Sequence, residues 1–351
     1  ALQPLDEARE RFQTLAEGGN PNAARMASVS LAEIGDCLLT LGRLDEAAQA
    51  YEAAIELAEA RDDQRSTAVS KGQLGTIRIL QKRYDAALSA WIDSRETFEQ
   101  LGEPGSVATA WHQIGVVHQE AGQYEAAEHA YQRSLGIKVQ RGDRSGEAMT
   151  LDQLGLLYQA MERREEAVRF HRQAATIRTE IQDLAAEGRS RNNVAIVLIQ
   201  LGRHDEAREE LERAIECREP YGHAVEPWKT FFLLHALERA VGNGKAATAA
   251  RQRALDAFLA YRRAGGENHN SDGRLAAAVH HALTSNTTDE IAAQLAELRE
   301  HPNLPTYRRP LIPALQAILA GSRDSALAED PALHYTDAAE ITLLLEALSS
   351  S

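Results

Sequence analysis

The stretch WHQIGVVHQEAGQYEAAEHAYQRSL, residues 111–135, decides the fold. Its first half places four residues at i, i+3, i+4 and i+7, the spacing of one helix face: Trp111, Ile114, Gly115 and His118. A short turn at Gly122-Gln123 follows, and a second helical face then carries Ala127, Tyr131 and Ser134. The stretch therefore predicts two helices that fold back on each other.

The same columns recur along the chain with a period of 40 residues. A small residue recurs at Gly35, Gly75, Gly115, Gly155 and Ala195, each preceded by an apolar residue. Twelve positions after each small residue stands an alanine, at Ala47, Ala87, Ala127, Ala167 and Ala207. Four positions later comes a bulky residue: Tyr51, Trp91, Tyr131, His171 and Leu211. A weaker sixth copy keeps the register at Leu234, His235, Ala247 and Arg251. Small residues let two helix backbones approach closely, so we interpret these columns as packing contacts.

Segments 111–135 and 151–175 (LDQLGLLYQAMERREEAVRFHRQAA) resemble tetratricopeptide repeats, and the resemblance covers roughly residues 28–260. The usual period of that family is about 34 residues, and its proline near the repeat end is missing here. The additional residues fall in the stretches EARDDQRS, LGEPGS and QRGDRSG. This longer repeat is similar to those of kinesin light chains and of bacterial MalT-like regulators. In those families the repeats bind peptides or partner proteins, or act as sensors beside an ATPase module. The resemblance implies an all-α, right-handed superhelical solenoid of antiparallel helix pairs.

The two ends of the chain depart from the repeat. Residues 4–12 (PLDEARERF) match RLDEAAQAY at 43–51, which predicts a partial repeat or an N-terminal capping helix over residues 1–19. We expect such a chain to be part of a longer protein, and its tail is similar in style to those of large bacterial repeat-bearing ATPases of the STAND type. Six helix pairs are predicted over residues 20–265 and a C-terminal helical cap over 266–351. Within the cap we expect helices near 274–284, 289–299, 309–319 and 337–348, the second capped by Thr288.

The resemblance also predicts a binding groove, because the first helices of successive repeats line the concave wall in this family. One position after each small residue lie Thr76, Val116, Leu156 and Ile196, and three further on lie Ile79, Gln119, Gln159 and Ile199. A polar row is expected beside them at His112, Asp152 and Asn192, with a basic end at Arg189 and Lys229. The alternative is that neighbouring helices cover these residues. The asparagine clamp of chaperone-binding members is not reproduced, since Asp36, Thr76 and Val116 stand where that clamp uses asparagine.

Composition narrows the class of partner. The net charge of -14, without a long basic run, disfavours nucleic acid. No apolar run reaches the roughly 18 residues of a membrane span, and no signal peptide opens the chain, so a cytoplasmic location is expected. Cys37 and Cys217 match no metal or disulfide spacing and are expected to be core residues in a reducing compartment. The sequence leaves homo-oligomer formation open.

No motif predicts catalysis or a cofactor. GNGKAA (242–247) resembles the end of a phosphate-binding loop but lacks its first glycine and its serine or threonine, so we interpret it as a turn. His280 and His281 are adjacent and point apart on a helix, although His269 could approach either of them.

The sequence thus favours a non-catalytic protein- or peptide-binding scaffold, the sensor or recognition part of a larger bacterial protein. One alternative is a regulatory receptor for a short peptide or a small molecule. A weaker one is a small hydrolase or metal site in the C-terminal region.

Overall fold

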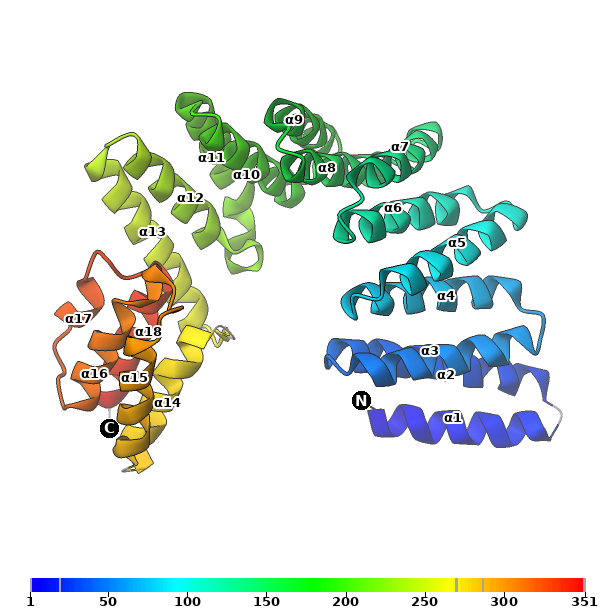
Figure 1. Cartoon of the computed structure of the whole chain (residues 1–351), viewed down its shortest axis with the longest axis horizontal. Helices are drawn as coiled ribbons and strands as arrows, with labels where there is room; N and C mark the ends of the chain where they lie inside the picture. Colours follow the sequence, from blue (N-terminus) through cyan, green and yellow to red (C-terminus); the bar gives the residue numbers. More distant parts are fainter. Residues whose placement is uncertain (1, 19, 269–270, 286, 350–351) are drawn as a thin grey trace. The chain divides into compact units, whose positions relative to one another are not determined.

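The computed structural model describes the chain apart from residues 1, 19, 269–270, 286 and 350–351. The described residues form helices and turns without a strand (Figure 1), which confirms the predicted all-α class. The chain divides into two compact units, Ala1–Asp183 and Leu184–Ser351. This division falls inside the predicted run of repeats, and the predicted segments 1–19, 20–265 and 266–351 stay a prediction.

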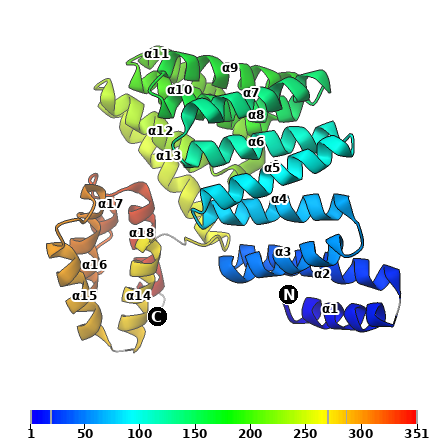
Figure 2. The same ribbon diagram turned by 45° about the vertical axis from the view of Figure 1, so that its right-hand side comes forward.

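Unit 1 is a stack of helix pairs (Figures 1 and 2). Helix α1 (Leu2–Glu17) packs on α2, and the four pairs α2–α3, α4–α5, α6–α7 and α8–α9 follow, each packed on the next. The bounds of the paired helices are α2 Pro21–Thr40, α3 Leu44–Glu59, α4 Gln64–Leu80, α5 Tyr84–Gln100, α6 Pro104–Glu120, α7 Tyr124–Gln140, α8 Arg144–Ala160 and α9 Arg164–Glu180.

The 40-residue period follows from the lengths of the helices. Helices α4 to α9 have 17 residues each and are separated by three-residue turns, so the stretches between the predicted repeats extend helices and form no long loop. The turns from 42 to 242 place a residue with positive φ at every twentieth position, glycine at most of them and Asp62, Lys82, Glu162 or Gln182 at the others. Such a left-handed residue is the usual end of a helix and reverses the chain.

The small columns place helix backbones against bulky side chains, as predicted. A Cβ added at Gly75 would lie 2.6 Å from Cδ1 of Trp91, and one at Gly115 would lie 2.6 Å from Cδ1 of Tyr131. Gly35 meets Tyr51 and Gly155 meets His171 in the same way. The alanines of the second column are almost fully buried: Ala47, Ala87, Ala127, Ala167 and Ala207. The glycines are therefore sites of close approach that any side chain would fill.

Unit 2 begins with two more pairs, α10–α11 and α12–α13. A 3-10 segment, η1, joins them, and its Gly222 has φ 53° and ψ -131°, a conformation open to glycine almost alone. Gly242 lies in the turn before α13, as expected for GNGKAA, and the side chain of Asn243 accepts a hydrogen bond from the Ala246 amide. The bounds are α10 Leu184–Gln200, α11 His204–Arg218, η1 Glu219–Val225, α12 Pro227–Ala240 and α13 Gly244–Arg263.

The remaining helices of unit 2 form a core of their own. Leu295, Leu315 and Ile341 are among its buried residues. A second cluster joins α18 to the sixth pair through Tyr335, which packs with Trp228 and Phe258. The four expected helices are present, but Thr288 is the first residue of α15 and does not cap it, and a short α17 was not expected. The bounds are α14 Ser271–Ser285, α15 Thr288–Glu300, η2 Thr306–Arg308, α16 Leu311–Leu319, α17 Ala326–Glu329 and α18 Tyr335–Ser349.

Candidate partner-binding surface

The predicted groove residues of unit 1 lie on the first helices α4, α6 and α8. Leu156 is exposed at 36%, whereas His112 is buried. The others are half-buried: Thr76, Ile79, Val116, Gln119, Asp152 and Gln159. Ile79 packs against the cluster that contains Trp91 and Ile114. Gln119 accepts a 2.9 Å hydrogen bond from the Tyr131 hydroxyl, and the Gln159 amide lies 3.3 Å from His171 Nε2. Most of these side chains therefore pack within the helix stack and are also partly exposed at the surface of the first helices.

An exposed row of aliphatic side chains lies on the same helix face and was missed by the sequence argument. Val29, Val69 and Met149 are exposed at 39%, 43% and 47%, and Thr109 occupies the same position in α6. Met149 and Leu156 are seven positions apart, so they lie on one side of α8. The repeat period alone could have found the row, because its members are 40 residues apart. We call Val29, Val69 and Met149 the aliphatic row.

His112 does not belong to an open polar row. It is only 8% exposed, because its ring packs against Tyr131 at a centroid distance of 5.4 Å. Its Nδ1 lies 3.4 Å from Thr150 Oγ1, which also accepts a 2.9 Å hydrogen bond from the buried Lys138 ammonium. The next helix pair therefore covers the His112 side chain, and the groove contact expected there stays a prediction.

Asp152 is half-buried and already engaged by its own repeat. Its Oδ1 lies 2.8 Å from Nδ1 of His171, and its Oδ2 accepts from the guanidinium of Arg178. His171 is fully buried and Arg178 is 8% exposed. The charge of the carboxylate is therefore paired with Arg178 of the same repeat, and a ligand at this position would contact an ion pair and not a free carboxylate.

The burial of His112 predicts a pH-dependent stability. Burial, with a smaller contribution from the positive charge of Lys138, lowers the pKa of His112 from 6.5 to about 4. Between these values the unfolded chain binds a proton that the folded chain excludes, so stability falls as the pH falls. We expect the free energy of unfolding to decrease by about 2 kcal/mol more in the wild type than in His112→Gln between pH 7 and pH 4.5. Urea denaturation at both pH values measures this difference, and equal pH slopes would contradict it.

The predicted groove residues of unit 2 lie on α10 and α12. Arg189 and Lys229 are exposed, and Lys229 pairs with Glu226 at 2.6 Å. Ile196 and Ile199 are half-buried. Asn192 is only 8% exposed, and its amide donates a 2.8 Å hydrogen bond to Thr230 Oγ1 in the next pair. Like His112, Asn192 thus forms a contact between repeats, and its expected role in the groove stays a prediction.

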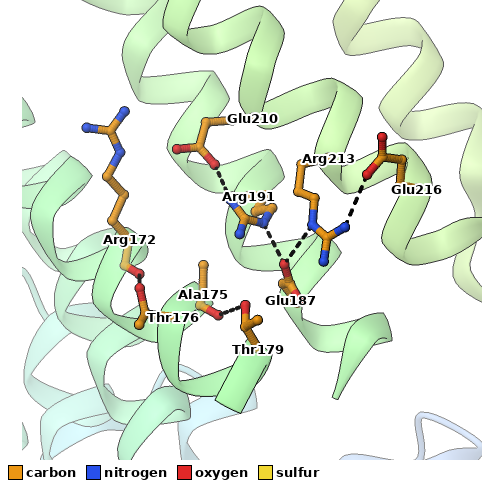
Figure 3. Close-up of polar contacts among 9 residues, drawn as sticks. All are labelled: Arg172, Ala175, Thr176, Thr179, Glu187, Arg191, Glu210, Arg213 and Glu216. Atoms are coloured by element: carbon orange, nitrogen blue, oxygen red, sulfur yellow. Dashed lines mark hydrogen bonds and ion pairs between the residues drawn. The ribbon is translucent and has the colours of Figure 1, made fainter. Parts of the chain in front are cut away.

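A buried carboxylate joins the helices of the α10–α11 pair (Figure 3). Glu187 is fully buried, and its Oε1 accepts from Nε of Arg191 at 2.8 Å and from Nε of Arg213 at 3.3 Å. Arg191 also donates to Glu210, and Arg213 donates to Glu216. Burial alone would lower the pKa of Arg191, but its hydrogen bonds to Glu187 and Glu210 hold that pKa above the ordinary value. We interpret this network as structural.

A cavity lies in unit 2, where the sixth repeat departs from the pattern. Its volume is about 1230 Å3, and its walls are α12, α13, the segment 323–332 and α18. His235 and Arg251, which stand at the small and the bulky columns, both line it. No glycine lies under a bulky ring in this pair; instead His235 contacts the Ala247 carbonyl across the pair at 2.8 Å. We call this cavity the cap cleft.

Comparisons with known proteins agree with this architecture. A family model described as "Tetratricopeptide repeat" matches residues 66–140, 106–180 and 146–220 in overlapping windows, and a second model of the same description matches 29–61. The matches together cover more than half of the chain. The chain belongs to the tetratricopeptide repeat family.

Solved structures of low sequence identity share the tetratricopeptide fold. BtubC (BKLC) from P. vanneervenii is 18% identical over 63% of this chain and 91% of that chain, with a TM-score of 0.56. Aspartyl phosphate phosphatase F from Bacillus subtilis is 13% identical over 80% of this chain and 73% of that chain, also with a TM-score of 0.56. A search of curated protein sequences finds no match. At these identities the likeness shows the fold alone.

The tetratricopeptide helices and the C-terminal helices show no arrangement for metal binding in the part of the chain that is described. There, no three histidine, cysteine or carboxylate side chains come together as an ion would require. His280 is half-buried and His281 exposed, while His269 lies outside the described residues.

The described helices also include none with the length and apolar character of a membrane span.

Proposed function

We propose that this protein is a non-catalytic scaffold that binds a partner protein or peptide on the first helices of unit 1. Tetratricopeptide repeats generally serve as protein-interaction scaffolds, and the fold is typically non-catalytic. The single observation that supports the proposed surface is the aliphatic row, which exposes Val29, Val69 and Met149 on equivalent positions of α2, α4 and α8. Leu156 extends it toward the end of α8.

The chemistry of this surface favours a partner with apolar side chains at regular spacing. Exposed aliphatic groups gain free energy when a partner removes them from water, about 25 cal/mol for each Å2 buried. The row is flanked by half-buried polar groups, Thr76, Gln119 and Gln159, which can bind a peptide backbone. A helix or an extended segment with apolar residues along one side would satisfy both sets of groups.

The wider role that we propose is recognition within a larger bacterial regulator in the cytoplasm. In this role the repeats would be the sensor or partner-binding part, and the activity that they control would reside elsewhere. The repeat length and the resemblance to kinesin light chains and MalT-like regulators support this role. Recovery of the same partner by the full-length protein and by this chain would test it.

The binding surface can be tested by a triple substitution. We expect Val69→Ser, Met149→Ser and Leu156→Ser together to weaken partner binding at least about tenfold, because each exposed aliphatic group contributes on the order of 1 kcal/mol when covered. The folded state should persist, since none of the three is a core residue. A photo-crosslinking amino acid at position 69 should capture the partner, and quantitative pull-down then measures the loss in the triple variant.

The matched control removes the same kind of side chain elsewhere in unit 1. Leu101, Val139 and Ile181 are exposed at 39%, 52% and 38% at the ends of the second helices α5, α7 and α9. Replacing these three by serine should leave partner binding unchanged. Equal loss of binding in the two triple variants, or full binding by the first, would contradict the assignment to the first-helix surface.

A further inference from the structure

The cap cleft gathers arginine side chains that have no carboxylate partner. Arg239 on α12, Arg251 on α13 and Arg323 before α17 all line it. Among the described residues none of the three forms an ion pair, although the chain carries a net charge of -14. The neighbouring pair behaves differently, since Arg203, Arg208 and Arg213 of unit 2 each pair with a glutamate. Three guanidinium groups thus face one cleft with their charges unmatched.

Each of these arginines keeps hydrogen-bond donors for a ligand. The Arg239 side chain is exposed and makes no hydrogen bond to a described residue. Arg251 uses Nη2 to donate to the carbonyls of Asp330 at 3.1 Å and Leu333 at 2.9 Å, and its other nitrogens have no partner among the described residues. Arg323 uses Nη1 for the carbonyls of Ile318 and Ser322. The backbone contacts hold two of the guanidinium groups in place, and the remaining N–H groups stay available.

The acidic side chains around the cleft do not cancel this charge. Glu346 lines it but pairs with Arg263 at 2.6 Å, and Glu329 is exposed on the rim. The Asp330 carboxylate accepts a 2.8 Å hydrogen bond from the Ala332 amide and acts on Arg251 only through space. Burial lowers the pKa of Arg251, with a smaller opposing effect of Asp330, which agrees with a guanidinium that lacks a direct counter-charge.

The rest of the lining and the size of the cleft indicate the kind of ligand. Leu255 and Leu345 are partly and largely buried aliphatic groups in the lining, beside Ala247 and Thr342. The volume of about 1230 Å3 exceeds the roughly 300–1,000 Å3 of ordinary small-molecule sites. Guanidinium groups bind carboxylates through paired N–H donors. The aliphatic lining offers a polyphosphate chain no favourable contact, whereas a peptide can alternate acidic and apolar side chains.

We propose that the cap cleft is a second binding site, and that it takes an acidic peptide segment with leucine-like side chains between its carboxylates. Arg239, Arg251 and Arg323 bind the carboxylates, and the aliphatic floor at Leu255 and Leu345 receives the apolar side chains. His235 donates from Nδ1 to the Ala247 carbonyl at 2.8 Å, so its Nε2 is left as an acceptor for a peptide N–H. This site is separate from the first-helix surface of unit 1.

A defined peptide tests the proposal without knowledge of the natural partner. The probe is a fluorescein-labelled octapeptide of alternating glutamate and leucine, titrated with the whole chain at physiological salt. We expect saturable binding, and about tenfold or more weaker binding by Arg239→Glu, because hydrogen bonds to a charged group contribute strongly. The Arg239 side chain is exposed and has no hydrogen bond or ion pair among the described residues, so the melting temperature of this variant should stay close to that of the wild type. Thr248→Trp, which fills the exposed wall of α13, should block the peptide as well.

Three controls decide the outcome. Arg274→Glu changes the charge equally at an exposed position of α14 outside the lining, and it should bind the peptide like the wild type. The same octapeptide with lysine in place of glutamate should not bind. Binding of the lysine peptide with equal affinity, unchanged binding by both Arg239→Glu and Thr248→Trp, or tighter binding of a single-stranded oligonucleotide of the same length would each overturn the proposal.

Discussion

Replacing Glu187 by alanine is expected to lower the free energy of unfolding by about 3–5 kcal/mol. The carboxylate is fully buried between α10 and α11, and its Oε1 accepts from both Arg191 and Arg213. Its removal leaves Arg191 with Glu210 alone and Arg213 with Glu216 alone. The substitution removes two charge-assisted hydrogen bonds to a fully buried carboxylate, each worth roughly 1.5–3 kcal/mol.

Glu216→Ala is the matched control for this prediction. Glu216 accepts from the same Arg213 at 3.1 Å, but its side chain is 65% exposed, so its removal should cost less than about 1 kcal/mol. Urea denaturation followed by circular dichroism measures both variants under the same conditions. Similar stability of Glu187→Ala and Glu216→Ala would show that burial of the carboxylate does not affect the free energy of unfolding, which would contradict the prediction.

The helix pairs could be predicted from the sequence because their contacts are periodic. Gly75 and Trp91 contact each other within one pair, and the same two columns recur 40 residues later at Gly115 and Tyr131. A contact between neighbouring elements that repeats along the chain leaves a signal in the sequence itself. The helix ends were harder to predict. Some turns have a left-handed residue that is not glycine, such as Lys82 or Glu162, so no glycine in the sequence marks the end of the helix.

The binding surface could be predicted only in part. Helical spacing shows on which side of a helix a residue lies, but it does not show whether a neighbouring helix covers that residue. His112 and Asn192 lie on the expected side, but the next pair covers them through Thr150 and Thr230. Those threonines are 38 residues away, and nothing in a single repeat reveals the contact. The cap cleft was missed for a similar reason, because α13 meets the segment before α18 only in the folded chain.

The aliphatic row and the cap cleft favour partners of different chemical character. The row exposes Val69 and Met149 on the first helices and favours a partner with apolar side chains. The cleft contains Arg239 and Arg251 and favours a partner with negative charge. A partner with an apolar segment and a separate acidic segment could use both sites, and substitutions in one site should then leave binding to the other intact.

The close contact between Gly115 and Tyr131 gives the second large prediction. Tyr131→Ala is expected to cost about 3–5 kcal/mol, because the ring is fully buried against the neighbouring helix. Gly115→Ala is expected to cost about 1–3 kcal/mol, although alanine favours a helix over glycine by about 1 kcal/mol. Its Cβ would lie 2.6 Å from ring atoms that cannot move away without disturbing the pair.

The double variant then tests the contact itself, because the sign of one substitution should reverse. Once Tyr131 is alanine, the space above position 115 is open, and Gly115→Ala should stabilise the chain by up to about 1 kcal/mol. Gly136, in the same helix as Tyr131, has nothing within 4 Å of an added Cβ, so Gly136→Ala should be stabilising in both backgrounds. Urea denaturation of the four variants of the cycle measures the coupling. Equal effects of Gly115→Ala with and without the tyrosine ring would mean that backbone and ring do not meet, and the packing of the helix pairs proposed from the repeat columns would be wrong.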